Sequence, residues 1–130
     1  MQKMADLLGK KADVEKYKNL AAEIKTAFNK TFWNLETKQY DRNSQAANAV
    51  ALYMGLTTPE NHQQVYENLV KDIRSRNNAL TAGDVGYRYV LRALEAGGAS
   101  DIIYDMNSKY DTPGYGWQLA HGATALTESW

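Results

Sequence analysis

The sequence predicts an all-α fold, built from helical hairpins of an α/α toroid or solenoid. Two observations lead to this fold class. Apolar residues recur at helical spacing along nearly the whole chain, and no segment shows a convincing alternating strand pattern. In addition, amphipathic segments alternate with nearly all-apolar ones. An amphipathic helix suits an outer layer and an all-apolar helix an inner layer, so the alternation predicts three stacked hairpins.

The expected outer helices are residues 13–30, 59–75 and 100–107. The first should be capped by Asp13, because a side-chain oxygen at this position can accept from the free N–H groups of the first turn. The second begins with Thr58-Pro59-Glu60, a cap followed by a proline and an acid in the first turn. Its apolar stripe is Val65, Leu69 and Ile73. The third is short and could be capped by Ser100.

The expected inner helices are residues 44–54, 84–96 and 117–130. The first contains no charged residue, and Gly55 provides a stop signal. In the second, the charges of Arg88, Arg92 and Glu95 form one narrow polar strip, and the rest of the circumference is expected to be buried. Gly97-Gly98 should end it.

The loops that lead into the inner helices, residues 31–43, 76–83 and 107–116, should lie at one end of the structure because successive inner helices run parallel. These loops carry aromatic and charged side chains, whereas the loops around 55–58 and 97–99 are short and plain. Function is therefore expected at the loop-rich end.

Composition excludes several classes of protein. The chain has 130 residues, the length of one domain, and 15 basic and 15 acidic side chains give no net charge. This balance disfavours nucleic acid and an anionic membrane surface as partners. No apolar run reaches the ~20 residues of a membrane span. The chain has no cysteine and two distant histidines, so no metal site or cofactor is expected.

Candidate site residues cluster near the end of the sequence. Glu128 is a single carboxylate in an uncharged run that follows the aromatic loop 111–117. Tyr115 and Trp117 could be platforms for sugar rings or packing anchors. Asp111 could bind a sugar hydroxyl or stabilise a turn. His121 could contact the site or be a structural residue.

The order and spacing of four segments resemble those of a known family. The segments are residues 81–89, residues 100–107, Pro113-Gly114-Tyr115-Gly116 and Gly122-Ala123-Thr124 through Glu128-Ser129-Trp130. Together they resemble the bacterial α-L-rhamnosidases. The resemblance implies about half of a catalytic (α/α)6 barrel over residues 1–130, within a larger multidomain enzyme. It implies inverting hydrolysis of a terminal α-L-rhamnosyl unit, a rhamnose-containing glycan as substrate, and Glu128 as general base. Where many members have Trp before this glutamate, the chain has Thr127.

In that family the general acid lies in an acidic motif upstream of the segments matched here, so the chain alone is expected to be inactive. The alternative is a non-enzymatic helical-hairpin module that binds a glycan or a protein. Half a toroid should also expose inner-helix surface and self-associate, and the residues expected at that surface are Ala46, Val50, Tyr89 and Val90. The compartment is left open.

Overall fold

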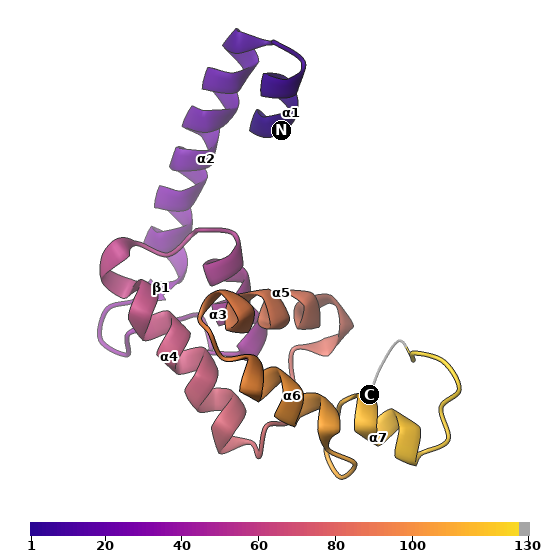
Figure 1. Ribbon diagram of the computed structural model, residues 1–130. Helices are drawn as coiled ribbons and strands as arrows, with labels where there is room; N and C mark the ends of the chain where they lie inside the picture. Colours follow the sequence, from indigo (N-terminus) through magenta and orange to yellow (C-terminus); the bar gives the residue numbers. More distant parts are fainter. Residues whose placement is uncertain (128–130) are drawn as a thin grey trace. The chain divides into compact units, whose positions relative to one another are not determined.

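The computed structural model describes residues 1–127, and it divides into two compact units, Met1–Trp33 and Asn34–Trp130. Each unit is described by itself. The elements in chain order are α1 (Gln2–Leu7), α2 (Lys11–Phe32), β1 (Trp33–Asn34), β2 (Gln39–Tyr40), α3 (Gln45–Tyr53), α4 (Pro59–Ser75), α5 (Gly83–Ala96), α6 (Ser100–Ser108) and α7 (Tyr115–Ala120) (Figure 1). The all-α prediction is confirmed, and the described residues also contain one short β-hairpin of β1 and β2.

The first unit is a hairpin of α1 and α2. The sequence did not predict α1, because six residues are too few to show a periodic apolar pattern; its one buried residue is Ala5. The predicted cap at Asp13 is wrong. Helix α2 begins two residues earlier at Lys11, and Asp13 lies inside the first turn, where a negative charge favours the helix dipole. No residue of α2 is buried in this structure.

Strands β1 and β2 form a two-stranded hairpin that the sequence did not predict. Each strand has two residues, which is too short for a visible alternation of apolar and polar side chains. In the turn, Oδ1 of Asn34 accepts hydrogen bonds from the N–H groups of Glu36 and Thr37, both at 2.9 Å. This Asx-type turn satisfies the backbone locally.

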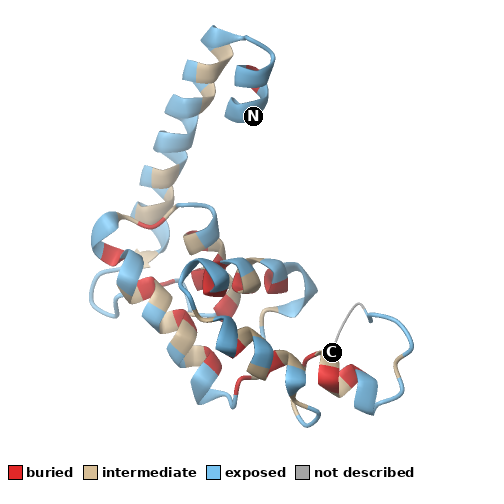
Figure 2. Cartoon of the chain, in the orientation of Figure 1, coloured by how far each residue is buried: buried red, intermediate tan, exposed pale blue. Residues whose placement is uncertain are grey.

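The core of the second unit lies between α3, α4 and α5, with α6 against α5 (Figure 2). The predicted stripe of α4 is confirmed, since Val65, Leu69 and Ile73 are fully buried. Helix α3 contacts α4 and α5. The buried apolar residues packed in this core are Ala49, Leu69, Ile73, Leu80, Tyr87, Val90, Ala93, Leu94, Ile102 and Met106.

The surfaces of α5 differ in part from expectation. The strip of Arg88, Arg92 and Glu95 is exposed as predicted. Val90, expected at an exposed inner surface, is instead fully buried in the core, because it faces the packed side of α5. Val85, on the circumference expected to be covered, is 76% exposed.

Polar contacts fix the helices of this unit to one another. The buried amide of Gln45 donates through Nε2 to the carbonyl of Ala79 at 3.0 Å and accepts from the N–H of Thr81 at 2.9 Å. The guanidinium of Arg74 on α4 pairs with Asp101 at 2.7 Å and Asp105 at 3.2 Å, both on α6. The two hydrogen bonds of Gln45 satisfy its own buried amide and two backbone groups of the loop before α5, which an apolar side chain could not do.

Helix termini follow the sequence signals in most places. At Thr58 a capping box forms with Asn61, and Pro59 occupies the first turn, as predicted. Gly55 has a φ of 64° and follows the end of α3. Ser100, expected as a cap, is instead the first helical residue, after an N-cap at Ala99 that makes no side-chain hydrogen bond.

The predicted helix 117–130 is wrong in its bounds, because α7 ends at Ala120. Gly122 has a φ of 81°, which is strained for any residue with a Cβ. The N–H of Gly122 bonds to the carbonyl of Leu119, and that of Ala123 to the carbonyl of Gln118. These two bonds form a Schellman motif, which ends the helix and reverses the chain. Within the described part of the chain, no helix is long and apolar enough to cross a membrane.

Candidate functional site

Of the three loops predicted to form the functional end, residues 107–116 join the end of α6 to the start of α7 and lie next to most of the candidate site residues in the sequence. Tyr115 opens α7 and is half-buried. Its ring meets the ring of Tyr87 edge to face, with centroids 5.6 Å apart and planes at 78°. This geometry is favourable for aromatic pairs, and it fixes the orientation of Tyr115 from the side of the core.

Tyr87 is itself held by α6. Its hydroxyl donates to Oδ1 of Asn107 at 2.6 Å, and Nδ2 of Asn107 donates to the carbonyl of Ile103 at 2.8 Å. Burial raises the pKa of the Tyr87 hydroxyl to about 12, so it stays protonated and remains a donor at neutral pH. The chain of contacts from Ile103 through Asn107 and Tyr87 therefore ends at Tyr115.

The backbone before α7 fits closely against the end of α6. A Cβ added at Gly116 would overlap the carbonyl oxygen of Lys109, and one at Gly114 would overlap that of Met106. Both glycines are buried. The absence of side chains at these positions lets the loop pass directly over the carbonyl groups, and this contact sets the point at which Tyr115 and Trp117 leave the core.

Trp117 and His121 form a stacked pair one helical turn apart. Their ring centroids are 4.0 Å apart and the planes differ by 25°. His121 Nδ1 lies 2.8 Å from the carbonyl oxygen of Trp117. A carbonyl only accepts, so Nδ1 carries the proton, and in the neutral tautomer Nε2 is left as an acceptor. One face of the indole is covered by the imidazole, so a sugar ring could stack only on the other face.

A groove of about 350 Å³ runs between α7 and the chain that returns after Gly122. One wall comes from Tyr115, Gln118 and Leu119, and the other from residues 123–126. Gln118 is 4% exposed, and within residues 1–127 its Nε2 has no hydrogen-bond partner. The groove is thus mainly apolar, with an aromatic ring and a buried amide at its side.

The predicted site residues are brought together only in part. Tyr115 lines the groove, whereas Trp117 and His121 pair with each other and are not among its lining residues. Asp111 is exposed in the loop before α7 and does not line the groove either. Glu128, the predicted base, lies outside the described residues. The return segment 123–126 leads to it in sequence.

Three residues at this end escaped the sequence reasoning: Tyr87, Asn107 and Gln118. Tyr87 and Gln118 have the spacing of ordinary packing residues, and Asn107 resembles a turn residue. Their importance comes from contacts between elements, which no local pattern reports. In the described part of the chain, no group of three or more His, Cys, Asp or Glu side chains is arranged to hold a metal ion.

The fold and the groove can now be set beside known proteins. The family model of the bacterial alpha-L-rhamnosidase six-hairpin glycosidase domain matches residues 1–130, so the chain belongs to this family. An alpha-L-rhamnosidase of Formosa agariphila is 26% identical over 128 residues, which cover 98% of this chain and 14% of that protein.

Solved structures agree. The alpha-L-rhamnosidase from Dictyoglumus thermophilum is 36% identical, with a TM-score of 0.92 over 99% of this chain and 15% of that chain. The Streptomyces avermitilis alpha-L-rhamnosidase complexed with L-rhamnose is 26% identical, with a TM-score of 0.90 over 99% of this chain and 12% of that chain. The chain thus spans about one seventh of the length of the proteins it matches.

Proposed function

We propose that the chain is part of an inverting glycoside hydrolase that releases terminal α-L-rhamnose from glycosides or polysaccharides. In this proposal it supplies the general base Glu128 and part of the sugar pocket. Membership of the family over residues 1–130 supports the hydrolase over a non-enzymatic binding module. The L-rhamnose complex of the Streptomyces avermitilis relative supports a rhamnose-containing glycan as substrate.

The observation that carries the proposal is the groove beside α7. One wall, residues 123–126, ends two residues before Glu128 in the sequence, and the opposite wall holds Tyr115 and the buried amide of Gln118. A sugar ring has apolar faces and hydroxyl groups around its edge, so a mainly apolar groove with one aromatic ring and one buried amide suits it. In this proposal Glu128, two residues beyond this wall in the sequence, acts on a sugar bound in the groove.

The proposed reaction uses two carboxyl groups on opposite faces of the sugar. Glu128 as base removes a proton from water, whose oxygen attacks the anomeric carbon, while an acid outside this chain protonates the leaving glycosidic oxygen. The bond from the anomeric carbon to that oxygen breaks, and the configuration inverts. The two carboxyl groups would be ~6.5–9.5 Å apart to leave room for the water.

The other candidate residues would hold the sugar. Tyr115 and the uncovered face of Trp117 would pack against the ring. Nε2 of His121 is an acceptor available to a sugar hydroxyl, and Asp111 could accept from another if the substrate extends to the loop. Among these, Tyr115 has the strongest support because it lines the groove.

The test is Glu128→Gln in a rhamnosidase that contains this chain, assayed with an aryl α-L-rhamnoside. Loss of a general base should reduce kcat by about 10²–10⁴-fold. Glu23→Gln, an exposed change on α2, is the matched control and should have normal turnover. Near-normal turnover of Glu128→Gln would refute the assignment. The 130-residue chain alone should hydrolyse nothing, and Glu128-dependent hydrolysis by it would contradict an acid located elsewhere.

A further inference from the structure

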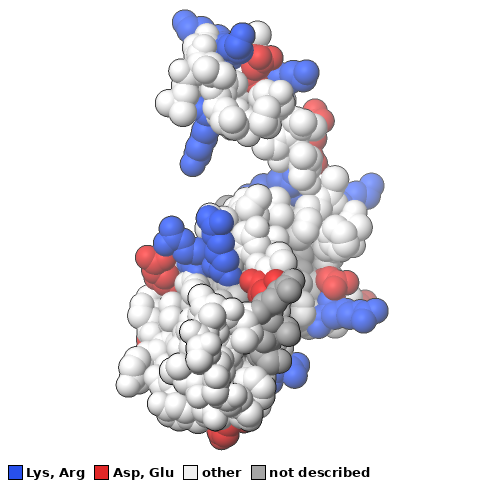
Figure 3. All heavy atoms as spheres, turned by 90° about the vertical axis from the view of Figure 1, so that its right-hand side faces the viewer, with Lys and Arg blue, Asp and Glu red and all other residues white. Residues whose placement is uncertain are grey.

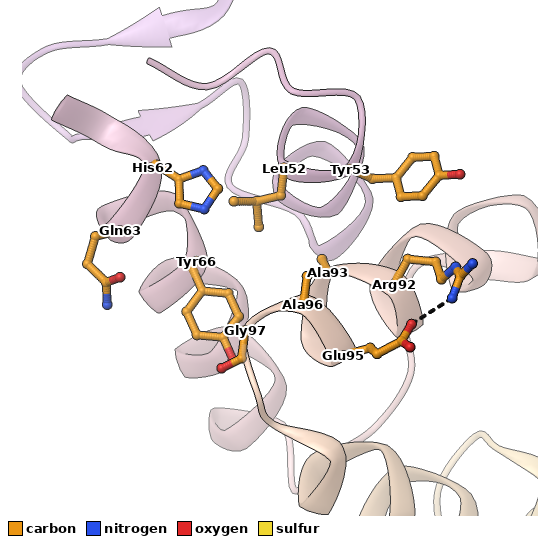
Figure 4. Close-up of a pocket in the computed structure, with 10 residues that line it drawn as sticks. All are labelled: Leu52, Tyr53, His62, Gln63, Tyr66, Arg92, Ala93, Glu95, Ala96 and Gly97. Carbon is orange, nitrogen blue, oxygen red and sulfur yellow. Dashed lines mark hydrogen bonds and ion pairs between the residues drawn. The ribbon is translucent and has the colours of Figure 1, made fainter. Parts of the chain in front are cut away.

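A second and larger pocket lies at the other end of the hairpins. Its volume is about 590 Å³, and it is formed by the end of α3, the first half of α4 and the end of α5 (Figure 4). It shares no lining residue with the groove beside α7. The volume is within the roughly 300–1,000 Å³ of small-molecule sites, so space alone permits a ligand of the size of a sugar.

The walls of this pocket are held in place by contacts between helices. The hydroxyl of Tyr66 on α4 donates to the carbonyl of Gly97 at the end of α5, at 3.1 Å. The ring lies so close to Gly97 that a Cβ there would overlap it. On the other side, His62 Nδ1 and Thr57 Oγ1 are 2.9 Å apart. Pre-organised walls reduce the entropic cost of binding.

The chemistry of the lining is mixed and close to neutral. Leu52, Ala93 and the Tyr66 ring provide apolar surface, and Gln63 provides a side-chain amide. Arg92 is paired with Glu95 at 2.7 Å, and both line the pocket (Figure 4). Because the guanidinium is already balanced by a carboxylate, the pocket does not favour an anion. A neutral ligand with apolar faces and many hydroxyl groups matches the lining best.

We propose that this pocket binds a neutral saccharide unit and is a second carbohydrate site, separate from the groove beside α7. An aromatic wall would pack against one face of the ring. The guanidinium donors of Arg92 that do not bond to Glu95, the second carboxylate oxygen of Glu95 and the side-chain carbonyl of Gln63 would bind hydroxyl groups at the rim. The Gln63 NH2 group itself donates to Glu67 at 2.9 Å. Such a site could retain a glycan chain. The proposal depends neither on Glu128 nor on hydrolysis.

The test is an NMR titration of the ¹⁵N-labelled 130-residue chain with methyl α-L-rhamnopyranoside and, separately, with methyl β-D-glucopyranoside. At least one should cause saturable amide shifts around Tyr66, Ala93 and Gly97, with a Kd of about 1–10 mM. The double variant Arg92→Gln/Glu95→Gln removes both rim charges and shortens the side chain at position 92. It should weaken binding at least about fivefold.

Tyr104→Ala is the matched control, since Tyr104 is 73% exposed on α6 and is not part of the pocket. It should bind as the unchanged chain does. The ¹⁵N spectrum of each variant reports whether its fold is intact. The proposal is overturned if neither sugar shifts these amides at about 50 mM, which is roughly five to fifty times the expected Kd. Shifts confined to residues 115–127, or tighter binding of inorganic phosphate than of either sugar, would also overturn it.

Discussion

The Tyr87 hydroxyl and Oδ1 of Asn107 are 2.6 Å apart and connect α5 to the end of α6. Tyr87 is 7% exposed and Asn107 is half-buried, so little water competes for the bond. The pair stands directly behind Tyr115, whose ring contacts that of Tyr87. The stability of this bond and the placement of the proposed sugar-binding tyrosine are therefore connected.

Removing either partner of this bond should destabilise the fold, and removing Asn107 should cost more than removing the Tyr87 hydroxyl. Tyr87→Phe keeps the ring contact and loses a hydrogen bond, which should lower the free energy of unfolding by about 1 kcal/mol. Asn107→Ala removes both the Asn107 acceptor of the Tyr87 hydroxyl and the side-chain donor to the Ile103 carbonyl, so it should cost more, about 2–3 kcal/mol. Urea unfolding measures both, with the exposed Tyr104→Phe as control. Equal, negligible effects would contradict a buried bond.

The raised pKa of Tyr87 predicts a loss of stability in strong alkali. The folded pKa is about 12 and the ordinary value is 10.0, so the folded state holds this proton more tightly than the unfolded state. Its contribution is fully present below pH 10 and disappears as the pH rises through 12. The difference corresponds to about 2–3 kcal/mol. Burial also raises the pKa of Tyr40, so the informative quantity is the comparison with Tyr87→Phe. Between pH 9 and 12 the unfolding free energy of the unchanged chain should fall by about 2 kcal/mol more than that of Tyr87→Phe, so its initial advantage of about 1 kcal/mol should be lost.

The sequence predicted the elements whose signals are local. Thr58-Pro59 marked the start of α4, and Val65, Leu69 and Ile73 marked its buried face, because caps and periodicity act within one helix. The sequence wrongly predicted one helix over residues 117–130, because its small and apolar residues are also typical of a buried helix. The Gly122 backbone conformation decided the outcome.

The candidate site was predictable only as a region. Tyr115 was found because an aromatic in a glycine-rich loop is conspicuous. The groove, by contrast, requires the chain to reverse after α7 and Gln118 to point inward, and both depend on packing between segments. The pocket around Tyr66 lies at the end with short, plain loops, where no motif suggested a site.

Gln45 should be one of the most sensitive polar residues in the chain. Its side chain is fully buried, donates to the Ala79 carbonyl and accepts from the Thr81 N–H. Gln45→Leu fills similar space but leaves both backbone groups without a partner, which should cost about 2–4 kcal/mol. The control is Gln63→Ala on the exposed side of α4, expected to change stability by less than about 0.5 kcal/mol. Thermal and urea unfolding give both values. An unchanged free energy of unfolding for Gln45→Leu would show that the loop 79–81 rearranges without cost.

Gly97 should not tolerate a side chain while Tyr66 is present. A Cβ at Gly97 would overlap the Tyr66 ring, although the backbone φ of −86° is open to alanine. Gly97→Ala should therefore cost about 1–3 kcal/mol through overpacking. In a Tyr66→Ala background the same change should cost much less, because the obstructing ring is gone. A double-mutant cycle from urea unfolding measures this coupling, and additive effects would mean that the ring moves aside without cost.

The chain in isolation is expected to form dimers or larger species. Of the inner-helix residues named for this role, Ala46, Val50 and Tyr89 are half-buried, and Val90 is excluded by its burial. Val85 on α5 adds an apolar side chain that is 76% exposed. On the face that Figure 3 shows, charged side chains are separated by broad uncharged areas, which offer little electrostatic repulsion to a second copy.

Sedimentation equilibrium over a range of concentrations tests this expectation. Val85→Ser should shift the equilibrium toward monomer several-fold, because about 1 kcal/mol of apolar contact corresponds to a factor of about five. Leu7→Ser is the matched control, since Leu7 is 87% exposed on α1 and lies outside the second unit. It should leave the association unchanged. A chain that stays monomeric at high concentration would contradict self-association. If both variants weaken association equally, the contact between copies does not lie specifically on the inner helices.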